Sequence, residues 1–202
     1  MTLVDSISIR RLGRVAYLPT LEAMRSFTSQ RNESSADELW LLEHPPVYTL
    51  GQGGEHGPVG NGIPLVKSDR GGDITYHGPG QLVVYTLVDL ARRGIKVRQF
   101  VALLEQAVID LLAGRGARRA GAPGVYVDGA KIAALGIRVR QGRAYHGLSL
   151  NVDMDLSPFS AIDPCGYSGL EVTQLRALGI DGSVVSVGER LAALLLERIE
   201  NA

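Results

Sequence analysis

The sequence predicts an α+β fold, in which one domain over residues 1–202 has a central, mixed and mostly antiparallel β-sheet flanked by helices. Three observations support this prediction. Short runs rich in Val, Leu and Tyr are separated by turns rich in Gly and Pro, which is typical of strands. Two well-separated segments instead repeat apolar residues every three to four positions, as amphipathic helices do. The composition, with 45% hydrophobic and 21% charged residues, is that of a globular protein with a sizeable core.

The first quarter of the chain predicts three strands and one helix. Residues 6–17 alternate loosely, as a strand does, and Pro19 marks the start of a helix. The apolar run 38–43 predicts a buried strand that ends at two consecutive prolines. Residues 47–50 predict the strand that follows.

The second quarter predicts two more strands and the clearest helix. The strands are expected at 63–67 and 81–88, with Pro64 near the start of the first, where a missing N–H is tolerated. Residues 97–113 predict a helix because their apolar positions share one helical face. These positions are Phe100, Leu103, Leu104, Ala107, Val108, Leu111 and Leu112.

The second half of the chain predicts strands joined by tight turns, and a last helix. Asp128-Gly129 is a strong signal for a two-residue hairpin within 124–136. Gln141-Gly142 predicts the next turn, before a strand at 144–152. Residues 187–199 predict an amphipathic helix.

The charge and the cysteine content argue against several classes of protein. Lys+Arg and Asp+Glu both number 21, so we expect no broad basic surface for nucleic acid or an anionic membrane. The single cysteine excludes an internal disulfide. No window reaches the roughly 18 uninterrupted apolar residues of a membrane-spanning helix, and no signal-peptide pattern opens the chain. We therefore expect a reduced, cytoplasmic protein.

Two glycine patterns have the outline of nucleotide-binding loops but lack their defining residues. The segment 51–57 has His56 where the dinucleotide-binding pattern needs its third glycine. Gly124 and Gly129 have the spacing of a phosphate loop, but Ile132 stands where Ser or Thr is required. The sequence therefore predicts no nucleotide site at either place.

Residues 70–81, RGGDITYHGPGQ, form a candidate ligand-binding loop. Five glycines and prolines surround Arg70, Thr75, Tyr76 and His77. Adjacent glycines allow backbone N–H groups to approach a ligand closely, and Arg70 can contact a polar or anionic group. The alternative is a turn-rich connection between two strands, in which His77 is an ordinary loop histidine.

Cys165 is a candidate nucleophile. It lies between Pro164 and Gly166, where a sharp, accessible turn is expected, although a lone cysteine is most often a small core residue. A thiol needs a base or a cation nearby to react at neutral pH. His77, His146 and Lys131 are the candidates for that partner, and the residues alone do not decide among them. Lys131 has a further alternative, since a lysine on an apolar strand usually points to solvent.

Six motifs together make the sequence similar to the lipoyl(octanoyl) transferase family. They occur in the family's order and run through most of the chain. They are EHPPVYTLG (43–51), RGGDITYHGPGQ (70–81), GVYV (124–127), KIAALG (131–136), YHGLSLN (145–151) and DPCG (163–166).

The resemblance implies a fold related to the lipoate and biotin protein ligases, and it implies roles for individual residues. Cys165 would carry the acyl group as a thioester, and Lys131 would lower the pKa of that cysteine. Three segments would contact the substrate. Their residues are Arg70, Gly71, Gly72, Asp73, Ile74, Thr75, Tyr76 and His77, then Ala134, Leu135 and Gly136, and then His146, Gly147, Leu148 and Ser149.

The reaction that the resemblance implies is the first step of protein lipoylation. An octanoyl group would pass from octanoyl-acyl carrier protein to a lysine of an apo lipoyl domain, without ATP and without a metal. The acceptors would be the lipoyl domains of 2-oxoacid dehydrogenase complexes and the H protein of the glycine cleavage system. Two alternatives stay open: an ATP-dependent lipoate or biotin protein ligase on the same fold, and a non-catalytic module that binds an acyl carrier.

Overall fold

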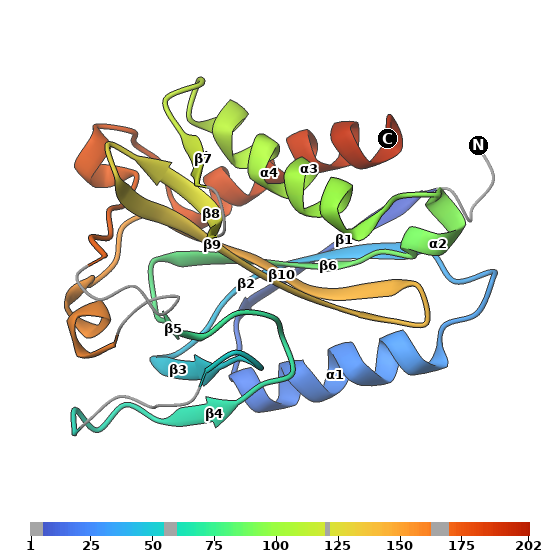
Figure 1. The fold of residues 1–202 in the computed structure, drawn as a ribbon, viewed down its shortest axis with the longest axis horizontal. Coiled ribbons are helices and arrows are strands. Elements are labelled where there is room, and N and C mark those ends of the chain that lie inside the picture. Colours follow the sequence, from blue (N-terminus) through green and yellow to red (C-terminus); the bar gives the residue numbers. More distant parts are fainter. Residues whose placement is uncertain (1–5, 55–59, 120–121, 163–169) are drawn as a thin grey trace.

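The structure, a computed structural model, describes residues 6–54, 60–119, 122–162 and 170–202. Its largest element is a seven-stranded sheet (Figure 1). In spatial order the strands are β1 (Ile7–Arg14), β2 (Asp37–Glu43), β6 (Gln81–Leu87), β10 (Arg143–Asn151), β9 (Ala130–Arg140), β8 (Ala122–Val127) and β7 (Ala117–Arg119). Only β1 and β2 pair in parallel, and every other neighbouring pair is antiparallel. The predicted mixed and mostly antiparallel sheet is therefore confirmed.

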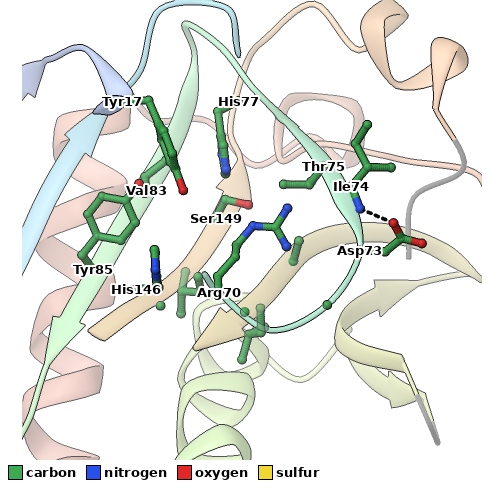
Figure 2. Close-up of a pocket in the computed structure, with 16 residues that line it drawn as sticks. Tyr17, Arg70, Asp73, Ile74, Thr75, His77, Val83, Tyr85, His146 and Ser149 are labelled. Atoms are coloured by element: carbon green, nitrogen blue, oxygen red, sulfur yellow. Dashed lines mark hydrogen bonds between the residues drawn. The ribbon is translucent and has the colours of Figure 1, made fainter. Parts of the chain in front are cut away.

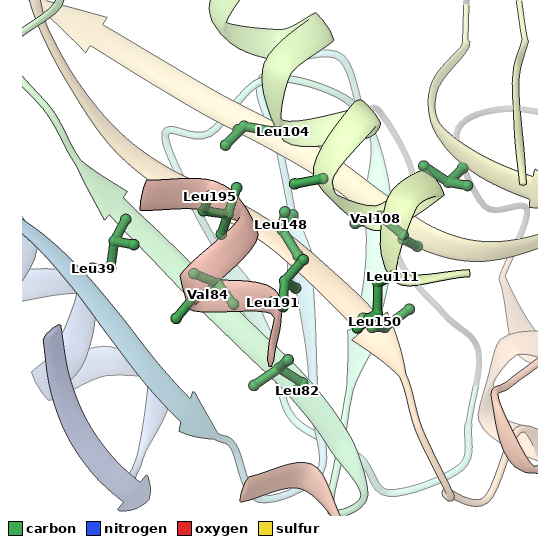
Figure 3. Close-up of a cluster of buried hydrophobic side chains, with 14 of the residues drawn as sticks. Leu39, Leu82, Val84, Leu104, Val108, Leu111, Leu148, Leu150, Leu191 and Leu195 are labelled. Carbon is green, nitrogen blue, oxygen red and sulfur yellow. The ribbon is translucent and has the colours of Figure 1, made fainter. Parts of the chain in front are cut away.

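Helices α3 (Val97–Leu111) and α4 (Val184–Glu200) cover one face of this sheet (Figure 1). The apolar stripe of α3 packs with that of α4 on Val84 and Leu148, from neighbouring strands (Figure 3). Phe100, Leu104 and Val108 are fully buried there, as the helical spacing predicts. This layer is the main core, and it leaves the opposite face of the sheet for other elements.

The opposite face carries helix α1 (Tyr17–Gln30) and a small second sheet (Figure 1). That sheet has the order β4 (Leu65–Lys67), β3 (Val47–Leu50) and β5 (Ile74–His77). Helix α1 begins at Tyr17, two residues before the predicted start, because Pro19 falls in the first turn, where its missing N–H costs no hydrogen bond. Short helices α2 (Leu90–Arg93), η1 (Ser157–Ala161) and η3 (Arg176–Leu178) complete the described elements.

The predicted tight turns are confirmed by their backbone angles. Asp128 and Gly129 have φ of 50° and 87°, and Gln141 and Gly142 have φ of 52° and 77°. Two consecutive residues with positive φ form the turn whose twist matches a hairpin, and Gly at the second position adopts it without a steric cost. These two turns set β8, β9 and β10 side by side.

Strand β5 was not predicted, because residues 70–81 were interpreted as a turn-rich loop. Ile74 and Tyr76 are buried and pair with Leu50 and Tyr48 of β3. Four residues between glycine-rich turns are too few for a clear alternating pattern, so only the pairing with β3 defines this strand.

Candidate active site

A cavity lies between β5 and the face of the large sheet that is opposite to α3 and α4 (Figure 2). It contains about 490 Å³ of empty space, including the open solvent at its mouth. Its walls come from β6, β9 and β10 below, from β5 and the loop before it above, and from the start of α1. The lining residues are Tyr17, Arg70, Gly72, Asp73, Ile74, Thr75, His77, Val83, Tyr85, Ala134, Leu135, Gly136, His146, Gly147, Leu148 and Ser149.

The three segments predicted to contact substrate meet in this cavity. All their residues line it except two. Gly71 instead donates its N–H to the carbonyl of Ile137 at 3.1 Å, which holds the loop onto β9. Tyr76 turns to the other side of β5 and packs against Tyr48 and Phe159. Contact with a substrate stays a prediction for all of these residues.

Three lining residues were not predicted: Tyr17, Val83 and Tyr85. Tyr17 opens α1, and Val83 and Tyr85 occupy alternate positions of β6, so that both point to the same face. Tyr85 carried no local signal, because it lies in a strand whose residues are all buried. The pairing of β6 with β10 puts it opposite Gly147, which has no side chain to block it.

Arg70 spans the roof of the cavity. Its guanidinium donates hydrogen bonds to the side-chain and backbone oxygens of Thr49 on β3, at 2.5 to 3.1 Å, and to the carbonyl of Gly71 at 3.0 Å. Gly136 faces the stem of this side chain, because a Cβ there would lie 3.3 Å from Arg70 Cδ and 2.8 Å from the carbonyl oxygen of Gly71. Arg70 thus brings a buried positive charge to the cavity and fastens the loop before β5 to β3.

His77 presents a hydrogen-bond acceptor toward the cavity. The amide nitrogen of Gln81 donates to Asn151 Oδ1 at 2.9 Å, so its oxygen accepts from Nδ1–H of His77 at 2.7 Å. The other ring nitrogen, Nε2, then carries the lone pair and lies 3.5 Å from the Thr49 hydroxyl. Burial, and next the proximity of His44, lower the pKa of His77 to about 3, so the ring is neutral at physiological pH.

His146 occupies a strained position in β10. Its φ is 62°, which L-residues rarely adopt, and this turns two consecutive side chains to the same carboxylate. Tyr145 donates to Asp69 Oδ2 at 2.7 Å, and His146 Nε2 donates to Oδ1 at 2.8 Å. Burial would raise the pKa of Asp69, but hydrogen bonds from His146, Tyr145 and Arg25 lower it below its usual range. Within the described residues, the buried Nδ1 of His146 has no hydrogen-bond partner.

His44 lies behind Tyr85, under α1. Its Nδ1–H donates to the carbonyl of Val15 at 2.7 Å, so its Nε2 accepts from the Tyr85 hydroxyl, also at 2.7 Å. Burial lowers the pKa of His44 to about 4, and the bond to Val15 opposes this only in part. The imidazole is therefore neutral in the folded protein.

The free energy of unfolding should fall as the pH drops from about 6.5 to about 4. In this window the unfolded chain protonates His44, whereas the folded protein keeps it neutral, so protons favour unfolding. For this one group the loss is ~3 kcal/mol between the two pKa values. Urea unfolding between pH 7 and pH 4 measures it, and His44→Gln should make the pH dependence shallower.

Tyr85→Phe is the control for this experiment. It removes the same hydrogen bond but keeps the buried ring, whose burial is the main cause of the lowered pKa, so most of the pH dependence should remain even if its stability is lower. Equal slopes for His44→Gln and the wild type would contradict the explanation.

A β-bulge turns Lys131 toward the cavity side of the sheet. Val125 pairs with Ala133, but Tyr126 pairs with Lys131, so Ile132 is an extra residue in β9. In a regular strand Lys131 and Ala133 would share a face, and Ala133 packs in the core under α3 and α4. With the bulge, Ile132 and Ala133 both face that core, and Lys131 faces the other way.

Lys131 lines a second cavity that adjoins the first. The second cavity has about 310 Å³ of empty space and shares Thr75, Ala134 and Ser149 with the first. Lys131 is only 4% exposed, so the alternative of a solvated strand lysine is wrong. The second cavity is also lined by Gln81, Ile132, Ala133, Asn151, Phe159 and Val172.

Cys165 lies outside the described residues, so its predicted role as a nucleophile is untested by the geometry. Phe159, before it in the chain, and Val172, after it, both line the second cavity. Lys131 N–H donates to the carbonyl of Glu171 at 2.8 Å, and Val172 packs in one apolar cluster with Phe159 and Ile162. The chain therefore leaves the described region at Ile162 and returns to it beside Lys131.

Two features are absent from the residues that the structure describes. There, no group of three or more His, Cys, Asp or Glu side chains could hold a metal ion. Within the same residues, no helix has both the length and the apolar character needed to cross a membrane.

Comparison with known proteins gives consistent matches. A family model described as "Lipoyl protein ligase A/B catalytic domain" matches residues 16–195. The chain is 64% identical over 195 residues to an octanoyltransferase of Aromatoleum aromaticum, covering 94% of this chain and 84% of that protein. It is 62% identical over 199 residues to an octanoyltransferase of Thiobacillus denitrificans, covering 96% and 91%. The crystal structure of lipoate-protein ligase A bound with ATP matches with a TM-score of 0.77 at 16% identity, over 95% of this chain and 85% of that one. The predicted likeness of fold to the lipoate ligases is confirmed.

Proposed function

The chain belongs to the lipoyl protein ligase A/B catalytic domain family and is an acyltransferase, and on this premise we propose that it transfers an octanoyl group from octanoyl-acyl carrier protein to a lysine of apo lipoyl domains. The acceptors are the lipoyl domains of 2-oxoacid dehydrogenase complexes and the H protein of the glycine cleavage system. The reaction takes place in the cytoplasm, in one catalytic domain over residues 1–202, through a thioester on Cys165.

One observation carries this proposal: the cavity lined by the predicted substrate-contacting segments adjoins the cavity of Lys131. Thr75, Ala134 and Ser149 form the walls that the two cavities share. An acyl chain in the first cavity, with its carbonyl carbon at these shared residues, would have its reacting end beside Lys131. The seven carbons beyond the carbonyl would gain ~5 kcal/mol from burial before the costs of binding.

The first half-reaction loads the enzyme. Lys131 takes the proton of the Cys165 thiol, and the thiolate attacks the thioester carbonyl of the donor. The bond between that carbonyl carbon and the carrier's sulfur breaks, and the carrier leaves as a thiol with the proton from Lys131. Backbone N–H groups of the glycine-rich loops stabilise the oxyanion, but the N–H of Gly71 is not among them, since it is bonded to Ile137.

The second half-reaction unloads the enzyme. The lysine amine of the acceptor attacks the octanoyl thioester, an amide bond forms, and the bond to Cys165 sulfur breaks. Lys131 takes the proton that the attacking amine loses and returns one to the Cys165 thiolate. Exchange between thioesters is nearly level in free energy and amide formation is downhill, so no nucleotide is needed.

Intact mass spectrometry tests the proposal and separates it from its alternatives. The protein is incubated with octanoyl-acyl carrier protein in the absence of ATP. We expect one octanoyl adduct, which hydroxylamine removes, which peptide mapping locates on Cys165 and which an apo lipoyl domain discharges.

The other results would favour other functions. Acylation of the lipoyl domain from free octanoate, only when ATP is added and with no adduct on the enzyme, would identify a ligase. Saturable binding of the carrier with neither reaction would identify a non-catalytic module.

A further inference from the structure

Gly124 leaves the space through which the side chain of Lys131 passes. A Cβ at this position would lie 2.7 Å from Lys131 Cε and 2.6 Å from the carbonyl oxygen of Ala133. The φ of Gly124 is 143°, a conformation that other residues rarely adopt. The backbone conformation of Gly124 in β8 and its lack of a side chain therefore both fit the position of Lys131 on β9.

Tyr126, two residues later on the same strand, holds the other end of this side chain. The Lys131 ammonium nitrogen lies 5.4 Å from the centre of the Tyr126 ring, within the range of a cation–π interaction. The Tyr126 hydroxyl donates to the carbonyl of Ala122 at 3.2 Å, which keeps the ring in place. The ring thus gives the ammonium group a fixed position in a cavity that is largely closed to water.

Glu105 of α3 anchors the glycine from behind. Its carboxylate accepts a hydrogen bond from the N–H of Gly124 at 3.0 Å and lies 3.2 Å from Arg118 Nε. The carboxylate is almost fully buried, although a negative charge is costly there unless it is paired. Because the buried carboxylate of Glu105 accepts a hydrogen bond from the Gly124 backbone, it holds this glycine against α3.

We propose that Gly124, Tyr126 and Glu105 are positioning residues for Lys131, which fix its side-chain nitrogen in the second cavity. The bulge at Ile132 determines which face of the sheet Lys131 lies on. Gly124, Tyr126 and Glu105 then determine the direction of its side chain on that face. The inference rests on the catalytic role of Lys131 proposed above, because position matters only if this nitrogen exchanges protons with the reacting groups. A displacement of about 1 Å in such a group costs about 10²-fold in rate.

Gly129 offers a matched control for Gly124. It lies in the same hairpin with φ of 87°, but a Cβ there meets nothing within 4 Å. Gly124→Ala and Gly129→Ala both place a side chain on a residue with positive φ, and only the first brings a Cβ against Lys131 and the carbonyl oxygen of Ala133.

Amine labelling with mass mapping measures how accessible the Lys131 side chain is, and this measurement does not depend on catalysis. Lys67 and Lys96, which are exposed, serve as internal standards. In the wild type and in Gly129→Ala, Lys131 should be protected relative to both. In Gly124→Ala the protection should be lost, and an unchanged labelling rate there would overturn the proposal.

A double-mutant cycle on acyl-enzyme formation then separates positioning from general damage. Gly124→Ala should slow the reaction by about 10²-fold, and Gly129→Ala should not. In the Lys131→Met background, Gly124→Ala should have no further effect, because the group that it displaces is already absent. Additive losses would mean that Gly124 acts on the fold alone and would overturn the proposal.

Tyr126 and Glu105 keep the proposal testable if Gly124→Ala does not fold. Tyr126→Leu should slow acyl-enzyme formation about tenfold, the equivalent of one cation–π interaction, and Tyr126→Phe should restore most of it. Glu105→Met should resemble Tyr126→Leu, whereas Glu105→Gln, which keeps an acceptor for the Gly124 N–H, should stay near the wild type. Equal rates for Tyr126→Leu and Tyr126→Phe, or for Glu105→Met and Glu105→Gln, would contradict the roles assigned here.

These results are distinguishable from a failure of the proposed function. If the wild type forms no octanoyl adduct, the mechanism fails, yet the labelling of Lys131 still reports whether Gly124 sets its position. If the adduct forms and Lys131 stays protected in Gly124→Ala, the positioning inference fails alone.

Discussion

Cys165→Ala is expected to abolish formation of the octanoyl-enzyme, and Lys131→Met to slow it by about 10²- to 10⁴-fold. A thiol with an ordinary pKa, about 8.5, is only a few per cent thiolate at neutral pH, so the nucleophile depends on a proton acceptor. Methionine keeps the length of the lysine stem between Gly124 and Tyr126, and it removes only the amine. Single-turnover mass spectrometry with octanoyl-acyl carrier protein measures both effects.

Lys67→Met is the matched control for the lysine. Lys67 is exposed on β4, at the end of the small sheet, so the same chemical change there should leave the rate near that of the wild type. Wild-type rates for Lys131→Met would exclude it as the proton acceptor. His77 and His146, both neutral and both at the first cavity, would then be tested in its place.

Asp37→Ala is expected to lower the free energy of unfolding by about 3–5 kcal/mol, the largest stability effect that the structure predicts. Asp37 is fully buried at the start of β2, where it accepts hydrogen bonds from three arginines. They are Arg31 at 2.5 Å, Arg92 at 2.8 Å and Arg93 at 2.6 Å. Without the carboxylate, three guanidinium groups of like charge would face a buried site and repel one another.

Urea unfolding with a comparison of midpoints and slopes measures this loss. Asp153→Ala is the control, because Asp153 and its partner Arg176 are 51% and 72% exposed and their ion pair contributes at most about 1 kcal/mol. A loss for Asp37→Ala no larger than that of Asp153→Ala would contradict the prediction. Acyl transfer in the surviving folded fraction should be unchanged, since Asp37 lines neither cavity.

Local patterns were sufficient to predict most of the large sheet and its helical layer. The helix α3 has apolar residues at nearly every position that its periodicity requires, and burial on one face follows from that spacing. Asp128-Gly129 and Gln141-Gly142 predicted their turns because positive φ at two consecutive positions restricts the residue types to a few. Each of these signals lies within a few residues, so it can be recognised without knowing the partner.

The candidate site was predictable only in part. Its motifs were visible because glycine, histidine and arginine cluster in them, and most of their residues line one cavity. Tyr17, Val83 and Tyr85 carried no comparable local signal, because their place at the cavity depends on where α1 and β6 lie in the tertiary structure. Strand β5 was missed for the same reason, as its four residues form a strand only through pairing with β3.

By itself, the sequence determined the chemical content of this protein: the motifs of its family, a lone cysteine between proline and glycine, and a lysine within an apolar strand. Only the tertiary structure decided which face of the sheet that lysine occupies. Strict alternation would direct Lys131 into the core, and the extra residue at Ile132 reverses it. A bulge is a mismatch between two paired strands, so it exists only once β8 and β9 have come together, and the spacing within β9 alone does not contain it.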